Sequence, residues 1–494
     1  MTLAVTPAPV AAPEPSTLPR PAADGVRVRP YDRRRRRRRA LTLTGAGLAY
    51  LALAVWSVHL KATETTEAYI PLYLDGVALQ ADGTVTDVTA ALGAAYLPGS
   101  RVLAADSDDP AARALAAEQR AWLAQGTVPG VGTAYEELVT GALLDIHTLT
   151  GATVDDDGRL SSAAPGAAVA GWTDRWRFVW PRDSSFVAAA LARTGHTEDA
   201  LAVLGYLQDV QSEGGGFQAR YLPGGAGVPD SRGIQIDGTG WTLWSAAAVL
   251  EAIDDDARRQ GAFDELRPLI DRSTDHILDL TDRAGHLPPP SADYWEVEEA
   301  ELTLGTVAPL LSGLEHAAAM YGAAGETGRS TAAAARAEQV RDAVEETFGP
   351  HGYTRYAGAG PANLLLGSNG RDAATAMLLP PFTAEPLDGA EAAWLASAAE
   401  MGRPAGGVAP GAGWKRDGIS WTPETTLYAL TAAANGHPDR ATGWLDWVAA
   451  HRTASGAIPE KVLAGGAPAA VAPLTWSGAN VILAVAALED IGAL

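Results

Sequence analysis

Two glutamates stand out because each lies beside residues that could shape a pocket. Residues 292–301 read ADYWEVEEAE, which places Glu296 directly after Tyr294 and Trp295. Far along the chain, residues 456–462 read GAIPEKV and place Glu460 between a proline and a lysine. Two carboxylates that face each other across a pocket, one in an apolar wall and one more solvated, meet the requirement for hydrolysis of a glycosidic bond.

The two carboxylates would have different tasks. The acid must keep its proton near neutral pH, and burial against a ring such as that of Trp295 would favour the protonated form. The base must ionise and hold a water molecule. A separation of roughly 6.5–9.5 Å leaves room for that water and gives inversion of the anomeric centre, whereas roughly 5–5.5 Å gives retention. The spacing of Glu296 and Glu460 along the sequence leaves this distance open.

The chain that must position these residues is mostly helical beyond about Gly130. Alanine and leucine are abundant, and helical patterns recur between loops rich in glycine and proline. About twelve helices are expected, starting near Ala134, Ser184, Thr197, Thr239, Phe263, Glu298, Thr327, Asp372, Ala390, Thr425, Pro438 and Ser477. Twelve helices predict an all-α fold of six antiparallel hairpins closed into a double ring, in which even and odd helices run in opposite directions.

Five motifs rich in tryptophan and acid precede even-numbered helices of this scheme. They are WPRD at 180–183, QIDG at 235–238, DYWE at 293–296, WTPE at 421–424 and PLTW at 473–476. The loop before the twelfth helix also contains Glu460. Loops at one rim of a ring converge on a single cavity, which is where binding sites form. The candidate substrate-binding residues are therefore Trp180, Arg182, Asp183, Asp237, Trp295, Trp421, Glu424 and Trp476.

Each motif taken alone also has a purely structural interpretation. Glu298, Glu299 and Glu301 indicate the acidic first turn of the sixth helix, where anions favour the positive end of the helix dipole. Individual alternatives are a helix cap for Asp183, a first-turn anion for Glu296 and Glu424, a turn residue for Asp237, and for Glu460 a solvated loop charge paired with Lys461. Only the motifs taken together indicate a site.

Composition and charge exclude several classes of function. The 494 residues contain no cysteine, which removes disulfides, thiolate metal sites and thiol nucleophiles, and the nine histidines show no ligand spacing. No metal or cofactor is therefore expected. The net charge of −22 is unevenly spread, because residues 1–61 carry a net +8 and the remainder a net −30. A body this acidic excludes nucleic-acid binding through its bulk field and suits a neutral substrate.

The first 128 residues predict three segments. Residues 1–39 are rich in proline and alanine, end in seven consecutive arginines, and are expected to be a disordered cytoplasmic tail. Residues 40–60 contain no charged side chain; as a helix they would be roughly 31 Å long, enough to cross a bilayer core. The arginines place the C-terminal body outside the cell membrane. A cleaved secretion signal is the alternative, and residues 61–128 form a short mixed segment with a hairpin and a helix.

Four motifs together, WPRDSSFVAAAL, DYWEVEE, GAIPEKV and PLTWSGANVILA, resemble glycoside hydrolase family 15, the glucoamylase-like inverting enzymes. The resemblance covers about residue 130 to the C-terminus and implies an (α/α)6 barrel over residues 129–494. It implies that Glu296 is the general acid and Glu460 the general base. Arg182 and Asp183 resemble the pair that grips hydroxyls of the terminal sugar, and the rings or walls of its pocket would come from Trp180, Trp295 and Trp476.

The chain also departs from this family. Trp421 stands in a region where an arginine is common, and Lys461 follows the candidate base where glutamine is expected. The large β-sandwich of bacterial relatives does not fit into residues 61–128. We expect a membrane-anchored, extracytoplasmic, inverting exo-glycosidase that acts on oligo- or polysaccharides with α-linked glucosyl or related ends. The alternatives are a trehalase-like or phosphorolytic enzyme, a hydrolase of cell-envelope glycans, and an inactive glycan-binding protein on the same barrel.

Overall fold

The structure is a computed structural model, and it describes residues 67–89, 94–151, 164–173, 175–225, 227–358 and 370–494. All of them belong to one compact unit, Val58–Leu494. The expected tail at 1–39 and the expected membrane anchor at 40–60 lie outside the described residues. Within the part of the chain described, no helix is both long and apolar enough to cross a bilayer.

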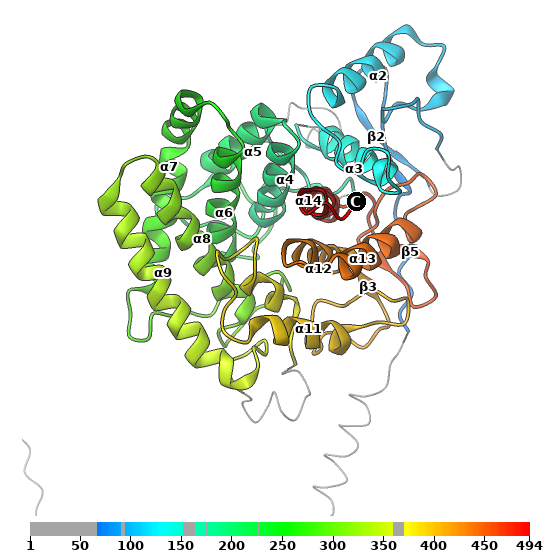
Figure 1. The fold of residues 1–494 in the computed structure, drawn as a ribbon. Helices are drawn as coiled ribbons and strands as arrows, with labels where there is room; N and C mark the ends of the chain where they lie inside the picture. Colours follow the sequence, from blue (N-terminus) through cyan, green and yellow to red (C-terminus); the bar gives the residue numbers. More distant parts are fainter. Residues whose placement is uncertain (1–66, 90–93, 152–163, 174, 226, 359–369) are drawn as a thin grey trace, which may run out of the picture. The chain divides into compact units, whose positions relative to one another are not determined.

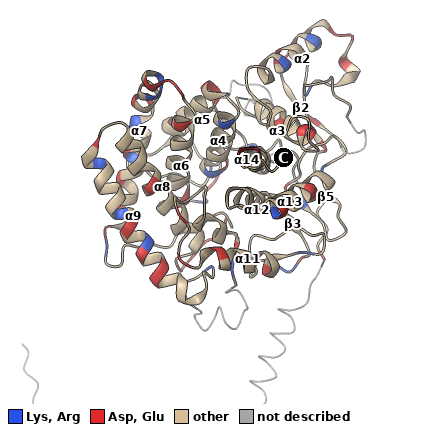
Figure 2. Ribbon diagram, viewed as in Figure 1, with Lys and Arg blue, Asp and Glu red and all other residues tan. Residues whose placement is uncertain are grey.

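Six helices form a closed inner ring. Each packs against the next, and the last packs back against the first. In order around the ring they are α4 (Pro181–Arg193), α6 (Asp237–Glu251), α8 (Leu304–Ala323), the 3₁₀ helix η3 (Ala373–Leu378), α12 (Thr422–Ala434) and α14 (Thr475–Asp490). Apolar residues dominate these helices because each is enclosed by neighbours on most sides. Charged residues are accordingly sparse on α12 and dense on the outer helices α7 and α9 (Figure 2).

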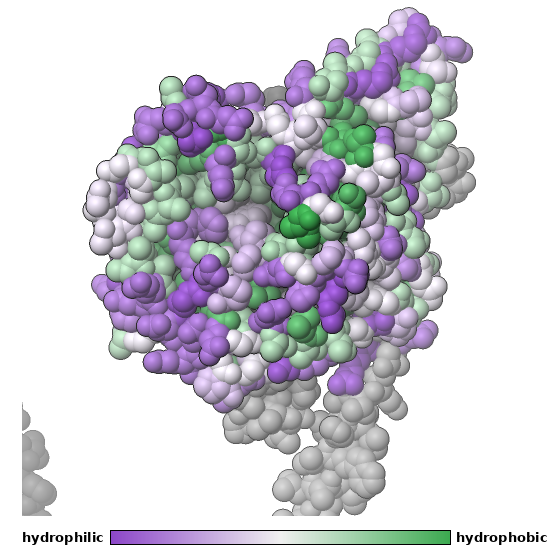
Figure 3. All heavy atoms as spheres, in the orientation of Figure 1, coloured by the Kyte–Doolittle hydropathy of each residue, from purple (hydrophilic) through white to green (hydrophobic). Residues whose placement is uncertain are grey.

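The remaining helices of the double ring lie outside the inner six. They are α3 (Glu136–Leu149), α5 (Thr197–Val210), α7 (Asp256–Thr281), α9 (Thr327–Phe348), α11 (Ala390–Met401) and α13 (Pro438–Ala450). Figure 1 shows α7, α9 and α11 at the periphery of the ring. On the face seen in Figure 3, hydrophilic side chains cover much of the outer surface, and smaller hydrophobic areas lie nearer the centre. The alternation of inner and outer helices agrees with the predicted six-hairpin barrel.

Three predicted helices differ clearly from the observed ones. The helix expected near Phe263 begins at Asp256, because Asp255 caps it by accepting a hydrogen bond from the Arg258 amide. The helix expected near Glu298 begins at Leu304, because Thr303 caps it by accepting a hydrogen bond from the Thr306 amide. The glutamates at 298, 299 and 301 therefore precede the helix, and their interpretation as its first turn was wrong. The eighth expected helix is the six-residue η3, which begins after Asp372, whose carboxylate accepts from the Ala374 amide.

The segment before the barrel is attached to it by hydrogen bonds. Strands β1 (Gly76–Leu79) and β2 (Val85–Val88) form an antiparallel hairpin, and α2 spans Pro110–Leu123. Asp75 accepts hydrogen bonds from the Ala454 amide and the Ser455 hydroxyl, so the hairpin is tied to the loop that leads to Glu460. Two short 3₁₀ helices complete the described helices, η1 (Ala104–Asp106) and η2 (Gly349–His351).

A small three-stranded sheet lies next to the inner ring. It consists of β3 (Ser420–Trp421), β4 (Lys461–Val462) and β5 (Pro468–Ala469), with β4 in the centre. The antiparallel register places Trp421 opposite Lys461. The sheet thereby brings the loop before α12 beside the loop that carries Glu460.

Candidate active site

One cavity of about 490 Å³ lies where the loops before the inner helices meet. Nine of the ten residues predicted for the site line it, and they come from five separate segments of the chain. They are Trp180, Arg182, Asp183, Trp295, Glu296, Trp421, Glu424, Glu460 and Trp476. The tenth, Asp237, does not line the cavity and contacts Arg182 instead. The rim predicted from helix parity is therefore where these side chains gather.

The acidic residues of the rim occupy the first turns of inner helices. Asp183 is the third residue of α4, Glu424 the third of α12 and Asp237 the first of α6. A helix N-terminus favours a negative charge through its dipole and its free amides. None of the three is a solvated surface charge, since all are buried. The cap interpretation of Asp183 and the simple turn interpretation of Asp237 were wrong, because Asp183 makes no cap hydrogen bond and Asp237 is a buried ion-pair partner within α6.

Arg182 connects the acidic groups at the bottom of the cavity. Its Nη1 lies 3.1 Å from Asp237 Oδ2, its Nη2 3.1 Å from Glu296 Oε1, and its Nε 3.6 Å from Asp183 Oδ2. The guanidinium also lies 5.1 Å from the ring centroid of Trp476. A buried guanidinium is stable only with such compensation, since an unpaired buried charge is strongly unfavourable. Arg182 thus fixes the loops before α4, α6 and α8 relative to one another.

Glu296 has an unusual backbone conformation. Its φ of 57° lies in the left-handed region, which a residue with a side chain adopts at a cost. The turn is imposed by Asp293, whose carbonyl accepts from the Glu296 amide at 2.8 Å and whose Oδ1 accepts from the Trp295 amide at 2.9 Å. Strain of this kind persists where the surroundings over-determine it, and it clusters at functional sites.

Arg355 supports this turn from beneath. The fully buried guanidinium contacts Asp293, Glu299 and Asp372 at 2.6–2.9 Å and lies 3.8 Å from the ring centroid of Trp295. Sequence reasoning missed Arg355, although its place in the loop before the eighth helix is the same signal that identified the other motifs. Trp414, which lines the cavity from the loop before α12, was also missed.

The carboxylate of Glu296 does not sit in the apolar wall that the sequence predicted. Its Oε1 accepts from Arg182 Nη2 and Gln235 Nε2, both at 3.1 Å, and its Oε2 accepts from Arg232 Nη1 at 2.5 Å. The ring of Trp295 packs against Arg355 and, edge to face, against Trp414. The prediction that Trp295 covers Glu296 was therefore wrong. Its ring is a wall of the cavity and packs on the buried guanidinium of Arg355.

Glu460 is held by the backbone on both sides. Its amide donates to the Val471 carbonyl at 2.8 Å, and its carbonyl accepts from the Thr422 amide at 3.0 Å. The residue is buried, and its Oε2 lies 3.1 Å from Lys461 Nζ, which in turn lies 4.1 Å from the Trp421 ring centroid. The pairing with Lys461 is present as predicted, but the solvated loop charge is not.

Burial sets the protonation of the other rim acids. Removal from water, with the charge of Glu460 nearby, raises the pKa of Glu424 to about 8. Burial likewise raises the pKa of Asp183 to about 7 and that of Asp237 to about 6, in spite of the neighbouring Arg182. Burial therefore favours the protonated form of Glu424 near neutral pH, and this form can donate a hydrogen bond to a ligand in the cavity.

Polar atoms without partners are concentrated in this cavity. Among the described residues, nine buried atoms of its lining make no hydrogen bond: Arg182 Nε, Asp183 Oδ2, Arg220 Nε, Glu424 Oε2, Glu460 Oε2 and the indole Nε1 of Trp295, Trp414, Trp421 and Trp476. Three of these atoms have only an ion-pair neighbour, Arg182 Nε with Asp183 Oδ2 and Glu460 Oε2 with Lys461. Buried polar groups in proteins are nearly always hydrogen-bonded, so a cluster of exceptions needs an explanation. Indoles that present both a ring face and an N–H suit a ligand with C–H faces and hydroxyls.

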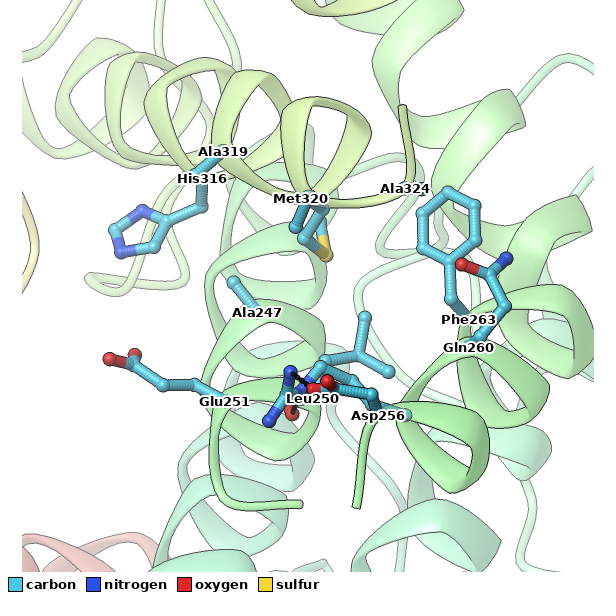
Figure 4. Close-up of a pocket in the computed structure, with 12 residues that line it drawn as sticks. Ala247, Leu250, Glu251, Asp256, Gln260, Phe263, His316, Ala319, Met320 and Ala324 are labelled. Atoms are coloured by element: carbon cyan, nitrogen blue, oxygen red, sulfur yellow. Dashed lines mark hydrogen bonds and ion pairs between the residues drawn. The ribbon is translucent and has the colours of Figure 1, made fainter. Parts of the chain in front are cut away.

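A second cavity lacks these unpartnered atoms among its described lining residues. The one drawn in Figure 4, of about 660 Å³, lies between α6, α7 and α8. Alanine side chains line much of it, and Asp256 is paired with Arg259 at 2.7 Å. Nor do the residues that the structure describes include a group of three or more His, Asp or Glu side chains arranged to hold a metal ion.

Comparison with known proteins gives a family and a fold. Residues 152–395 match the family model of Glycosyl hydrolases family 15. No curated protein matches the chain. Similar solved structures include a glycosidase variant in complex with glucose, at 22% identity and TM-score 0.57, covering 72% of this chain and 97% of that one. A bacterial glucoamylase complexed with acarbose matches at 18% identity and TM-score 0.57, covering 76% and 58%.

A third similar structure is the glucoamylase from Saccharomycopsis fibuligera, at 11% identity and TM-score 0.57, covering 72% of this chain and 96% of that one. At these identities the likeness concerns the fold. The barrel of this protein is thus the glucoamylase-like barrel.

Proposed function

Because the chain carries a domain of glycosyl hydrolases family 15 and is a glycoside hydrolase, we propose that it removes α-linked glucosyl or related units from non-reducing ends with inversion. The proposal rests above all on one observation. Two carboxylates from distant segments, Glu296 and Glu460, line the same cavity, which also holds the cluster of unpartnered polar atoms.

The terminal sugar would occupy the buried end of the cavity. Arg182 and Asp183 would bind its hydroxyls, since charge-assisted hydrogen bonds are stronger than neutral ones. The protonated Glu424 and the indole N–H groups of Trp421 and Trp476 would donate to its oxygens. Because Arg182, Asp183 and Glu424 are buried, the end of a glycan chain would reach them more readily than its interior, which supports exo-action.

Bond cleavage would need two proton transfers. Glu296 would give a proton to the glycosidic oxygen as the bond from the anomeric carbon to that oxygen breaks. Glu460 would take a proton from a water molecule that attacks the anomeric carbon from the opposite face, which inverts its configuration. Lys461 and the backbone bonds of Glu460 would hold the base in place for this attack.

The choice of glucose as the sugar is supported by the similar structures, one of which is a complex with glucose. The test is incubation of the protein, from about residue 62 onward, with a panel of α-glucosides, trehalose and envelope glycans, with and without phosphate. Release of free glucose from α-glucosides without phosphate supports the proposal. A product that appears only with phosphate, as a sugar phosphate, would favour a phosphorolytic enzyme on the same barrel.

We further propose that residues 40–60 anchor the enzyme in the cell membrane with its barrel outside the cytoplasm. The support is the sequence alone: 21 residues without a charged side chain follow seven arginines. Fractionation of cells that express the full chain tests this proposal. The proposal predicts that an antibody against the barrel detects the protein in the membrane fraction, and that protease added to intact cells stripped of their outer layers removes this signal. Detection only in the soluble fraction would contradict the proposal.

A further inference from the structure

The outer part of the cavity is lined by cations, although the chain as a whole carries a net charge of −22. Arg175, Arg232 and Lys415 all line it and are exposed. Among the described residues, Arg175 and Lys415 have no side-chain ion pair. Lys415 lies 5.3 Å from the ring centroid of Trp414, so the charge is held above a wall of the cavity. We call these three residues the cationic mouth.

Arg232 occupies the atom of Glu296 that catalysis needs. Oε1 of Glu296 accepts from two donors, Arg182 and Gln235, whereas Oε2 accepts only from Arg232 among the described residues. A carboxyl that donates a proton must carry it on one of its two oxygens. Arg182 is buried and fixed by three acids, but the Arg232 side chain is 40% exposed. A proton on Oε2 is repelled by the adjacent positive charge of Arg232, so Glu296 is easier to protonate there when Arg232 moves away.

A displaced guanidinium needs another partner. Asp230 lies 3.4 Å from Arg232 Nε, but it is already bonded to the buried Arg220. The general acid faces the leaving-group oxygen, so the groups that reach Glu296 from its exposed side lie where the leaving group would bind. An anionic group on the leaving group would meet Arg232 there, with Arg175 and Lys415 contributing long-range attraction.

We propose that the substrate carries an anionic group, a phosphate or a carboxylate, on its leaving-group side, and that this group binds the cationic mouth and draws Arg232 away from Glu296 Oε2. Arg232 is thus a positioning and specificity-determining residue that acts through the acid. The inference rests on the proposed role of Glu296, and it names the substrate class of the same site. It replaces the neutral substrate expected from the overall charge, because the local charge at the mouth is opposite in sign to that of the whole chain.

The test compares α-glucosides that differ in the charge of the leaving group. Maltitol and maltobionate form one pair, with a neutral polyol and a carboxylate; glucosylglycerol and its phosphate ester form the other. We expect kcat/KM to be roughly ten-fold or more higher for the anion in at least one pair, a preference that falls with added salt. The pair that shows the larger ratio identifies the carboxylate or the phosphate as the natural group.

Substitutions in the cationic mouth separate its attraction of the anionic group from the contact of Arg232 with Glu296. Arg232→Met should bring the anion-to-neutral ratio of kcat/KM close to one, because the cation that binds the anionic group is then absent. Lys415→Met should raise KM for the anion only. Arg258→Met is the matched control, since Arg258 is similarly exposed and paired with Glu198 on the outer face. Equal rates on neutral and anionic sugars in the unmodified enzyme, or an equal loss on both in Arg232→Met, would overturn the proposal.

A binding measurement keeps this result separate from the proposed hydrolysis. Calorimetry with the Glu460→Gln variant should show tighter binding of maltobionate or of the phosphate ester than of its neutral partner, and Arg232→Met should remove the difference. A preference in binding without turnover by the unmodified enzyme would contradict the hydrolytic function and leave the anion site standing. Turnover without any preference in rate or binding would contradict the anion site alone.

Discussion

Arg182 Nη2 lies 3.1 Å from Glu296 Oε1, and the same guanidinium contacts Asp237 and Asp183. The group that would bind the terminal sugar is therefore bonded directly to the candidate acid. Arg182 and the acids it contacts thus form one ion-pair cluster that would both bind the sugar and carry the proton donor. The cluster is buried, since Arg182 is 5% exposed. This arrangement explains why an acidic side chain stands in a strained turn ahead of α8.

Replacement of either candidate carboxylate by its amide should abolish most of the activity. For Glu296→Gln and Glu460→Gln we expect kcat to fall by roughly 10²–10⁴-fold, the usual contribution of general acid–base catalysis. Circular dichroism should show the same helical content as in the unmodified enzyme. Glu315→Gln, which alters a glutamate paired with Arg341 outside the cavity, is the control and should keep full activity. Full activity in either test variant would remove that residue from the mechanism.

Asp293→Asn tests the support of the acid. The amide keeps the size of the side chain but loses the charge opposite Arg355 and weakens the bond to the Trp295 amide. We expect kcat to fall about ten-fold or more with a smaller change in KM, because misplacement of a catalytic group affects the transition state most. Asp271→Asn, at the outer ion pair with Arg329, is the control. A rise in KM with kcat unchanged would contradict this role.

Trp476→Phe tests the unpartnered indole N–H groups. The change keeps a ring beside Arg182 and removes one donor that faces the cavity. We expect kcat/KM for an α-glucoside to fall roughly five- to ten-fold, the value of one neutral hydrogen bond. Trp394→Phe removes an equally buried and unpartnered N–H on α11, away from the cavity, and should leave kcat/KM unchanged. Equal behaviour of the two variants would mean that the N–H of Trp476 does not bind substrate.

Glu424 should make the stability of the protein depend on pH. Its pKa is raised from 4.5 to about 8 by burial, so the folded state binds more protons than the unfolded state between these values. The contribution of Glu424 to the free energy of unfolding is fully present below about pH 4.5 and is lost as the pH rises from there through about 8. Glu424→Gln removes this dependence, and at pH 8.5 its free energy of unfolding should exceed that of the unmodified protein by at least about 1 kcal/mol.

The corresponding measurement is denaturant unfolding at pH 5.5 and pH 8.5. At the lower pH the free energies of unfolding of the two proteins should differ much less, since in the folded state both carry a neutral side chain at this position. A gain in stability of equal size at both values would show that titration of Glu424 is not the cause.

The double ring could be predicted because helical periodicity and loop punctuation are local signals. The same parity argument located the cavity, since helices that alternate in direction must present alternate loops at one end. The start of α7 was missed although a local cap, Asp255, sets it, whereas the start of α8 depends on tertiary contacts. The chain at 298–303 stays out of α8 because Glu299 bonds Arg355 and Thr303 bonds Asp293, and both partners are fixed by the fold.

The electrostatics of the site could not be predicted in the same way. The parity of the helices brings the loops of Arg182 and Gln235 to the same rim as Glu296, but it does not indicate that these two side chains and Arg232 bond to that carboxylate. The wrong environment for Glu296 followed from reading neighbours in the sequence as neighbours in space. Arg232, on which the specificity proposal depends, belongs to no motif.

The central claim is that Glu296 and Glu460 cleave an α-glucosidic bond with a water molecule between base and sugar. The most direct measurement follows the first turnovers of an α-glucoside by proton NMR and identifies the anomer released before mutarotation. The account predicts β-glucose. Initial release of α-glucose would mean retention and would contradict the assignment of Glu460 as a base that activates water.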